Sequence, residues 1–395
     1  MSKTVMFVFG TRPEAIKLAP IILKMKALNQ VRTHVCVTAQ HRHMLDQVLE
    51  VFGIIPDSDL DLMTPNQTLA GFASRAISTL NSFFEESRPD MVIAQGDTTT
   101  VFVAGLCAFY HRIPFAHVEA GLRTENKFSP FPEEINRRLA TRLTDIHFAP
   151  TEWAKQNLIS EGIPEKAIHV TGNSVIDALL IASEKVKAKH PVIPGLPFDL
   201  MSIPDRQMVL ITGHRRESFG QGFESLCSAI SSLSEMFPDY KFIYPVHLNP
   251  NVREPVYRIL SNRTNVHLIE PVAYLEFVAL MLQSKIILTD SGGVQEEAPT
   301  LGKPILVMRE NTERPEAVKA GCARLVGTNK ERIVSEVKRL LTDTSAYRAM
   351  SQVTNPYGDG KTSERIAAIV HESMARSASL KGLESQLQDN YRAGK

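Results

Sequence analysis

Short apolar runs alternate with longer amphipathic segments along most of the 395-residue chain. The amphipathic segments, such as residues 14–28, 69–86 and 273–283, have helical spacing, whereas the apolar runs have the length and composition of strands. Strands that are apolar on both faces are typical of parallel sheets covered by helices. The runs form two series, at residues 5–9, 33–38, 91–94, 115–118, 146–149 and 168–171, and at residues 208–212, 241–244, 266–269, 285–289 and 304–308. The chain is therefore predicted to be an α/β protein with two doubly wound domains.

A change in composition separates the two series. Residues 185–189 form the lysine-rich end of a predicted helix, and residues that cannot continue a helix follow it: Pro191, Pro194, Gly195, Pro197 and Pro204. We therefore expect a linker near residues 173–205. Residues 363–377 are predicted to be helical, and residues 378–395 form a polar tail with weak periodicity.

Composition argues against several classes of protein. A net charge of +1 is untypical of a general nucleic-acid or membrane-surface binder. No apolar run approaches the ~20 residues of a membrane span, and no signal peptide is recognised, so a reducing cytoplasm is the simplest expected location. The widely spaced cysteines fit neither a zinc site nor a disulfide framework and are expected to be small buried residues. They are Cys36, Cys107, Cys227 and Cys322.

Polar residues cluster directly after predicted strands, where open parallel sheets bind ligands. With two facing domains, the expected site is the cleft between them. After the first strand, Gly10 allows a tight turn, Thr11 can cap a helix, and Pro13 suits its first turn. Arg12 and Lys17 then lie near a helix N-terminus, which favours an anion. The alternative is a capped surface helix with two solvated cations.

Three carboxylates follow further strands of the first series. Asp97 lies after residues 91–94 and can be either a helix cap or a carboxyl aimed into the cleft; the cap is favoured on the residues alone. Glu119 follows an apolar strand, so burial can raise its pKa and suit it to proton transfer, unless it forms a structural ion pair with Arg123. Glu133 and Arg137 share one helix face, and that spacing by itself favours a surface ion pair.

The second series carries a predicted phosphate site. His214 follows residues 208–212 and can position a phosphate or exchange protons, although a structural histidine is the alternative. Ser291, Gly292 and Gly293 follow residues 285–289 at a helix start, where free N–H groups can bind a diphosphate. Glu297 lies about one turn further, within reach of ribose hydroxyls. Additional charge near the same edge comes from Arg309, Arg314 and Glu316.

These clusters, in this order, resemble the bacterial non-hydrolysing UDP-N-acetylglucosamine 2-epimerases. The matching stretches are FGTRPEAIKLAP, QGDTTT, HVEAGLRT, PEEINRR, TGHRRESFG and TDSGGVQEEAPTLGKP, and the resemblance runs from about residue 4 to residue 375. It implies a fold similar to that of GT-B glycosyltransferases, in which two Rossmann-like domains face each other across a cleft that binds UDP. It also implies that the C-terminal helix crosses back to the first domain. The expected domains are then residues 1–172 with 363–380, and residues 173–362, followed by a tail at 381–395.

The resemblance implies reversible epimerisation of UDP-N-acetylglucosamine to UDP-N-acetylmannosamine, with no redox cofactor and no metal. UDP leaves by anti elimination to give 2-acetamidoglucal, and bound UDP then re-adds. Asp97, Glu119 and Glu133 match the family's catalytic carboxylates, with the proton-abstracting base left open, and Arg137 and His214 match residues that support the substrate and leaving group. The UDP-site positions carried over by motif are Arg12, Lys17, Asp97, Glu119, His214, Phe277, Ser291, Gly292, Gly293, Glu297 and Arg314. Near Phe277 the chain departs from the family's common motif, with Val272 in place of glutamine.

The resemblance also implies a homodimer, domain closure around the substrate, and activation by the substrate bound beside the active site. The matching activation residues are Gln40, His41, His43, Arg215 and His247. His43 and Asn66 replace residue types found in some regulated members, so retained activation is a hypothesis. The alternatives for the whole chain are a hydrolysing epimerase that releases ManNAc and UDP, a GT-B-type glycosyltransferase, and a catalytically silent UDP-sugar sensor.

Overall fold

A computed structural model describes residues 3–38, 42–64, 67–124, 126–204 and 207–376, without the side chains of residues 42–44. The chain forms two compact units. Unit 1 contains the residues up to Ala178 and those from Gly358 onward, and unit 2 is Leu179–Tyr357.

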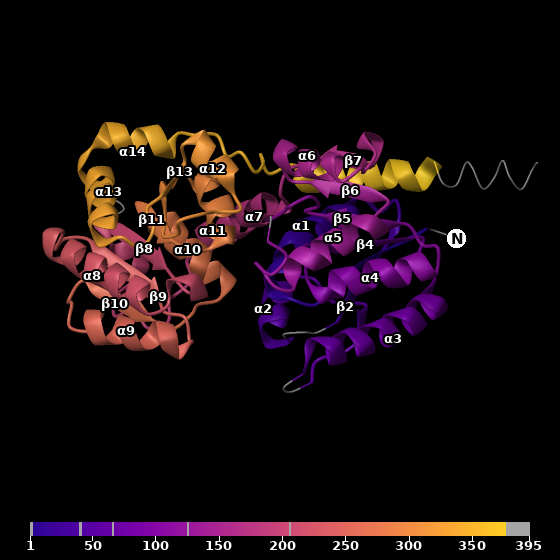
Figure 1. The fold of residues 1–395 in the computed structure, drawn as a ribbon, viewed down its shortest axis with the longest axis horizontal. Coiled ribbons are helices and arrows are strands. Elements are labelled where there is room, and N and C mark those ends of the chain that lie inside the picture. Colours follow the sequence, from indigo (N-terminus) through magenta and orange to yellow (C-terminus); the bar gives the residue numbers. More distant parts are fainter. Residues whose placement is uncertain (1–2, 39–41, 65–66, 125, 205–206, 377–395) are drawn as a thin grey trace, which may run out of the picture. The chain divides into compact units, whose positions relative to one another are not determined.

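Within its described residues, unit 1 contains a seven-stranded parallel sheet of strand order β3-β2-β1-β4-β5-β6-β7 (Figure 1). The strands are β1 (Thr4–Phe9), β2 (Arg32–Val37), β3 (Ser58–Asp59), β4 (Met91–Gln95), β5 (Phe115–Val118), β6 (Ile146–Ala149) and β7 (Ile168–Val170). The helices are α1 (Arg12–Leu28), α2 (Arg42–Phe52), α3 (Leu69–Ser87), α4 (Thr99–Tyr110), α5 (Glu133–Leu143), α6 (Glu152–Ser160), the 3₁₀ helix η1 (Glu165–Ala167), and α7 (Ser174–Ala188), which continues into unit 2.

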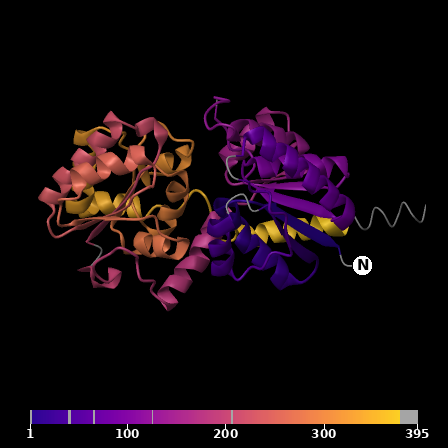
Figure 2. The ribbon, with the colours of Figure 1, turned by 90° about the horizontal axis from the view of Figure 1, so that it is seen from below.

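Unit 2 contains, in its described part, a six-stranded parallel sheet of order β10-β9-β8-β11-β12-β13, which Figure 2 shows from a second direction. The strands are β8 (Met208–Thr212), β9 (Lys241–Pro245), β10 (Val266–Ile269), β11 (Ile286–Thr289), β12 (Ile305–Val307) and β13 (Ala323–Leu325). The helices are α8 (Gln221–Met236), α9 (Pro250–Leu260), α10 (Tyr274–Gln283), α11 (Gly292–Glu297), α12 (Pro315–Ala320), α13 (Lys330–Thr342) and α14 (Thr344–Ser351). The described part of the unit also contains the 3₁₀ helices η2 (Leu200–Ser202), η4 (Arg216–Ser218) and η5 (Ala298–Leu301).

Each sheet has its own apolar core. The central strand β1 is buried along Val5–Phe9 in unit 1, and the central strand β8 is buried along Met208–Ile211 in unit 2. In both units helices pack on the sheet, as expected for parallel strands that are apolar on both faces (Figures 1 and 2). The two doubly wound, Rossmann-like domains predicted from the sequence are therefore confirmed.

Two edge strands, β3 and β13, were not predicted. Each has only two or three residues, and β3 reads Ser-Asp, so neither carries an apolar run. These strands form by backbone pairing with the neighbouring strands, β2 for β3 and β12 for β13. The four cysteines are buried and free, as expected.

A last helix, over residues 362–376, belongs to unit 1 and lies along it in both views (Figures 1 and 2). Its first turn is capped by Asp177 of α7, which accepts hydrogen bonds from the backbone N–H of Thr362 (3.3 Å) and of Ser363 (2.8 Å), and from the Ser363 hydroxyl (2.6 Å). Near its other end, Lys3 donates to the carbonyl of Met374. Among the described helices, none is long and apolar enough to cross a membrane.

Candidate functional site

Two of the predicted carboxylates lie at the carboxyl ends of neighbouring strands in unit 1. Strands β4 and β5 pair in register, with Gln95 opposite Val118. Asp97 is two residues past the end of β4, and Glu119 directly follows β5. The parallel register therefore brings both acids to one edge of the sheet.

Glu119 is surrounded by hydrogen-bond donors. Oε1 accepts from Lys17 Nζ and from Asn173 Nδ2 (3.1 Å), and Oε2 accepts from Gln95 Nε2. The backbone of Glu119 has φ +67°, a left-handed conformation that a non-glycine residue adopts only where its surroundings impose it. The side chain is only 7% exposed. The sequence predicted a confined carboxyl here, but not the two amides that orient it.

Asp97 is bound by the guanidinium of Arg137. Nε and Nη2 both donate to Oδ2, at 2.9 and 2.6 Å, and the neighbouring Asn136 donates to the carbonyl of Asp97 at 2.9 Å. Arg137 and Asn136 are on the buried face of α5. Thr98, and not Asp97, caps α4, since its hydroxyl accepts from the N–H of Val101. The cap interpretation of Asp97 is therefore wrong, and its carboxylate is bound by α5 instead.

Two ion pairs considered from the sequence are replaced by others. Arg137 pairs with Asp97 and, at 3.3 Å, with the fully buried Glu134, whereas Oε2 of Glu133 is buried without a hydrogen-bond partner. Arg123 binds both carboxylate oxygens of Glu161, at 2.7 and 2.9 Å. Glu119 therefore pairs with a lysine 102 residues away in sequence, and not with the nearby arginine.

Glu14 is a further buried acid at the same sheet edge, and the sequence analysis did not single it out. Its Oε2 accepts from the N–H groups of Gly10 (3.0 Å) and Thr11 (2.7 Å), and its Oε1 accepts from the Thr98 hydroxyl (2.6 Å). Burial raises its pKa, while these hydrogen bonds act in the opposite direction. The sequence signal that could have revealed it is the T-x-x-E capping box at residues 11–14.

His117 supports the turn that carries Asp97. Its Nε2 is 2.7 Å from the carbonyl of Gly96, so this nitrogen carries the hydrogen. Burial lowers its pKa to about 4, and burial lowers the pKa of the neighbouring-strand residue His147 to about 3. Both histidines are therefore uncharged at neutral pH.

In unit 2, the predicted residue His214 lies beside a buried acid. Strands β8 and β11 pair with Thr212 opposite Thr289, so the loops that follow them meet. Asp290 Oδ2 accepts from the backbone N–H groups of His214 (2.7 Å) and Arg215 (2.8 Å), and His214 Nδ1 is 3.1 Å from Oδ1. Burial raises the pKa of Asp290, but the hydrogen bonds and the charge of His214 outweigh it, so the net shift is downward.

His247 packs against the same ring. The His214 and His247 rings are stacked, with centroids 5.7 Å apart and an interplanar angle of 23°. Burial and the neighbouring His214 lower the pKa of His247. The structure thus brings together a residue expected in catalysis and one expected in activation.

The predicted phosphate loop begins α11. Ser291 is the N-cap residue, and its side chain makes no capping hydrogen bond. A Cβ on Gly292 would lie 2.7 Å from Cζ of Arg314, so only glycine fits beneath that guanidinium. Arg314 is fixed by Glu296 and Glu313, each 2.8 Å away. Cations next to a helix N-terminus that starts with two glycines suit a diphosphate.

Glu297 lies at the end of α11, buried, and accepts a hydrogen bond from the hydroxyl of Tyr274 at 3.3 Å. Tyr274 begins α10, which also carries the half-buried Phe277. Tyr274 was not singled out from the sequence, because only the fold brings the start of α10 next to the end of α11.

Some predicted residues are not brought to these clusters by any described contact. Arg12 is exposed at the first turn of α1. Gln40, His41 and Asn66 lie outside the described residues, as does the side chain of His43. Among the described residues, no group of three or more His, Cys, Asp or Glu could hold a metal ion.

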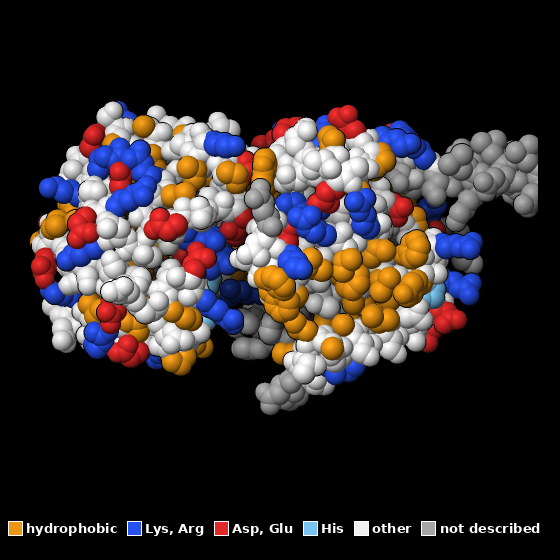
Figure 3. All heavy atoms as spheres, in the orientation of Figure 1, with side chains coloured by type: hydrophobic (Ala, Val, Ile, Leu, Met, Phe, Trp, Pro, Cys, Tyr) orange, Lys and Arg blue, Asp and Glu red, His pale blue; other side chains and the backbone are white. Residues whose placement is uncertain are grey.

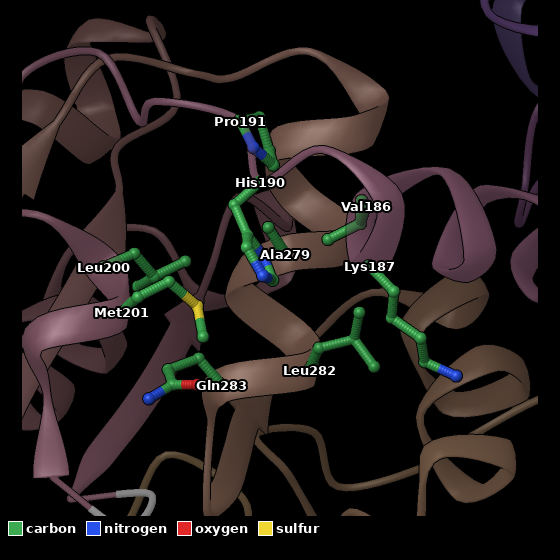
Figure 4. Close-up of a pocket in the computed structure, with 9 residues that line it drawn as sticks. All are labelled: Val186, Lys187, His190, Pro191, Leu200, Met201, Ala279, Leu282 and Gln283. Atoms are coloured by element: carbon green, nitrogen blue, oxygen red, sulfur yellow. The ribbon is translucent and has the colours of Figure 1, made fainter.

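An open pocket of about 480 Å³ lies elsewhere in unit 2, beside α10 and the end of α7 (Figure 4). Its lining is largely apolar and includes none of the predicted site residues. The lining residues are Val186, Lys187, His190, Pro191, Leu200, Met201, Ala279, Leu282 and Gln283.

Comparison with known proteins identifies close relatives. A family model described as UDP-N-acetylglucosamine 2-epimerase matches residues 23–371. The chain is 54% identical over 363 residues to UDP-N-acetylglucosamine 2-epimerase of Escherichia coli (strain K12), covering 92% of this chain and 96% of that protein.

Solved structures agree with this finding. UDP-GlcNAc 2-epimerase from Neisseria meningitidis, solved bound to UDP-GlcNAc, matches with a TM-score of 0.85 and 49% identity, over 93% of this chain and 100% of that one. The Methanocaldococcus jannaschii enzyme, solved in complex with UDP-GlcNAc and UDP, matches with a TM-score of 0.76 and 35% identity, over 93% and 99% of the two chains.

Proposed function

The chain belongs to the UDP-N-acetylglucosamine 2-epimerase family, and from this premise we propose that it interconverts UDP-N-acetylglucosamine and UDP-N-acetylmannosamine without hydrolysing them. The observation that carries the proposal is the pair of polar clusters: carboxylates at the β4–β5 edge of unit 1, and a glycine-rich helix start flanked by His214 and Arg314 in unit 2.

The reaction is balanced without an external oxidant or water. A base removes the proton from carbon 2 while the bond between carbon 1 and UDP breaks, which leaves a double bond between the two carbons. UDP then bonds again to carbon 1, and a proton returns to carbon 2 from the opposite face. Because the two proton transfers occur on opposite faces, the site needs at least two groups that exchange protons.

The unit 1 carboxylates meet this need in different ways. Glu119 is bound by three donors, which fix the direction of its carboxylate. Asp97 is bound on Oδ2 alone, by Arg137, and its side chain is 30% exposed. Glu133 has an unpartnered carboxylate oxygen. We therefore propose that Asp97, Glu119 and Glu133 share the proton transfers, with Lys17 orienting Glu119 and Arg137 orienting Asp97.

Unit 2 supplies the groups that suit the leaving group. Negative charge develops on the diphosphate as its bond to carbon 1 breaks, and preformed donors at that position lower the barrier. Gly292 and Gly293 offer N–H groups at the start of α11, and Ser291, whose own N–H donates to Thr289, offers its hydroxyl. Arg314 and His214 offer side-chain donors, and Glu297 suits a ribose hydroxyl.

The deciding experiment is incubation with UDP-N-acetylglucosamine alone in D₂O, followed by NMR. We expect UDP-N-acetylmannosamine to accumulate to an equilibrium mixture, with deuterium at carbon 2 of both sugars. Release of free N-acetylmannosamine and UDP as the main products would instead establish hydrolysis. Epimerisation that retained the original hydrogen would exclude proton exchange with solvent at carbon 2. Asp97→Asn, Glu119→Gln and Glu133→Gln should each reduce kcat at least ~100-fold.

We also propose that the substrate activates the enzyme, with Arg215 and His247 contributing from unit 2. The support is that His247 stacks on His214, so that a ligand touching His247 would act on the predicted catalytic ring. Initial rates should be measured with UDP-N-acetylmannosamine, with and without a trace of UDP-N-acetylglucosamine. Equal rates would reject activation.

A further inference from the structure

Asp290 and His214 form an acid–histidine pair that the proposed chemistry does not yet use. Asp290 is 1% exposed, and Oδ1 has no well-aligned hydrogen-bond partner among the described residues. His214 Nδ1 is 3.1 Å from this oxygen, and a small rotation of the ring would align them. A buried carboxylate oxygen without a donor is costly, so the stable arrangement places a hydrogen on Nδ1.

None of the other charged or titratable groups considered near the His214 ring takes the place of Asp290 as the partner of Nδ1. His247 stacks on the ring face and does not contact its nitrogens in the ring plane. Arg215, next in sequence, is 4.0 Å from Glu313 and binds Asp290 only through its backbone. The side chain of His214 is 38% exposed, so part of it remains accessible to a ligand while Nδ1 lies beside Asp290.

We propose that Asp290 is a positioning residue, which holds a hydrogen on Nδ1 of His214 and so leaves Nε2 as the nitrogen that takes a proton from solvent and donates it in a hydrogen bond to the diphosphate of the substrate. The proposal rests on the proposed function, because it gives His214 a substrate to meet. A histidine whose one nitrogen is bound by a buried acid acts through the other nitrogen, as acceptor when neutral and as donor when charged.

An asparagine at position 290 gives an unusually clear test. Both backbone N–H groups, of His214 and Arg215, donate to the same oxygen, Oδ2. In Asp290→Asn the amide oxygen must therefore occupy that position, and the amide NH₂ must face His214 Nδ1. Nδ1 can then only accept, so the hydrogen moves to Nε2. The loop keeps its two backbone hydrogen bonds while the tautomer reverses.

The measurement is long-range ¹H–¹⁵N NMR of the full chain labelled in histidine, at about pH 9, above the ordinary pKa range of imidazole. A His214→Gln spectrum assigns the His214 signals. We expect the Nδ1–H tautomer in the parent protein, and the Nε2–H tautomer in Asp290→Asn with kcat lowered by roughly 10²–10⁴. Asp343→Asn is the matched control, since Asp343 also accepts two backbone N–H groups on one oxygen, at 2.8 and 3.0 Å, but caps the surface helix α14. It should change neither tautomer nor rate.

An Nε2–H tautomer in the parent protein would overturn the proposal, as would an unchanged tautomer in Asp290→Asn. A reversed tautomer with the parental kcat would equally overturn it. If the parent protein did not epimerise its substrate at all, the proposed function would fail, but the spectra would still decide whether Asp290 sets the tautomer.

Discussion

Gly292 lies where a single methyl group has no space. Its Cβ would meet Cζ and Nη1 of Arg314 at 2.7 and 2.9 Å, and two glutamates keep that guanidinium in place. Gly292→Ala should therefore reduce the free energy of unfolding by about 1–2 kcal/mol through crowding. Urea denaturation without ligand measures it.

Gly293 provides the control for this prediction. A Cβ there would have its nearest contact 3.9 Å away, at Oε2 of Glu297, so Gly293→Ala should not destabilise the protein. In an Arg314→Ala background, Gly292→Ala should also become nearly neutral. An equal cost in both backgrounds would show that Arg314 is not the cause.

His117 should make stability depend on pH. Its pKa in the folded protein, about 4, lies below its ordinary value, so the unfolded chain binds a proton first as the pH falls. The contribution of uncharged His117 to the free energy of unfolding is fully present above about pH 6.5 and is lost as the pH falls towards 4. His117→Gln keeps a donor for the carbonyl of Gly96. Between pH 7.5 and pH 5 it should lose about 2 kcal/mol less than the parent protein. Denaturant titrations at the two pH values measure this, and equal losses would contradict it.

For individual residues, the sequence identified the site carboxylates but not the side chains that bind them. Glu119 was a candidate from its position after a strand, and Asp97 became one through the family resemblance. Their cations, Lys17 and Arg137, come from helices that only the fold brings close. The ion pair considered between Glu119 and the nearby Arg123 does not form, because Arg123 pairs with Glu161. Asp290 was overlooked because its function depends on β8 lying beside β11.

At the scale of elements, Asp177 connects two helices that are far apart in sequence. It lies on α7 and caps the helix over residues 362–376 with three hydrogen bonds. Asp177→Ala should lower the free energy of unfolding by about 2–3 kcal/mol, because it leaves buried N–H groups without acceptors. Glu184→Ala, on the same helix and paired only with the exposed Lys187, should have little effect. Equal losses in urea denaturation would mean that the cap does not matter.

The central strands were predictable from the sequence, whereas the short edge strands β3 and β13 were not, for a physical reason. Burial on both faces forces β1, β4, β8 and β11 to be continuously apolar, which leaves a clear pattern in the sequence. β3 and β13 are short edge strands whose pairing comes from a neighbour's backbone, which carries no side-chain signature. The six-residue helix α11 is likewise too short for periodicity, and its glycines were the only signal.

At the scale of the whole molecule, unit 1 exposes an apolar face, visible as the large orange area in Figure 3. It includes two aromatic rings at the end of α4, two before α5, and two aliphatic side chains on α5: Phe109, Tyr110, Phe128, Phe131, Ile135 and Leu139. The four aromatic residues are 59–67% exposed and together leave roughly 500 Å² in water. That matches the largest patches of monomers and a large share of the ~800 Å² that each partner buries in a standard interface.

We therefore propose that a second copy of the chain covers this face, in the homodimer that the family resemblance implies. Leu139→Glu, which places a charge on this face, should convert the protein to a monomer at micromolar concentration, as measured by light scattering. Val192→Glu is the control, because Val192 is 88% exposed but belongs to unit 2, whereas this face belongs to unit 1. A parent protein that is already monomeric would contradict the expectation.

The path of the chain has a consequence for how the protein is made. Unit 2 is continuous, whereas unit 1 is built from both ends of the sequence, and its last helix needs Asp177 as a cap. A ribosome therefore releases every residue of unit 2 before it releases the final piece of unit 1. Unit 1 emerges first but cannot complete its fold until its last helix has been synthesised. Unit 2, which is encoded between the two parts of unit 1, can already fold during translation.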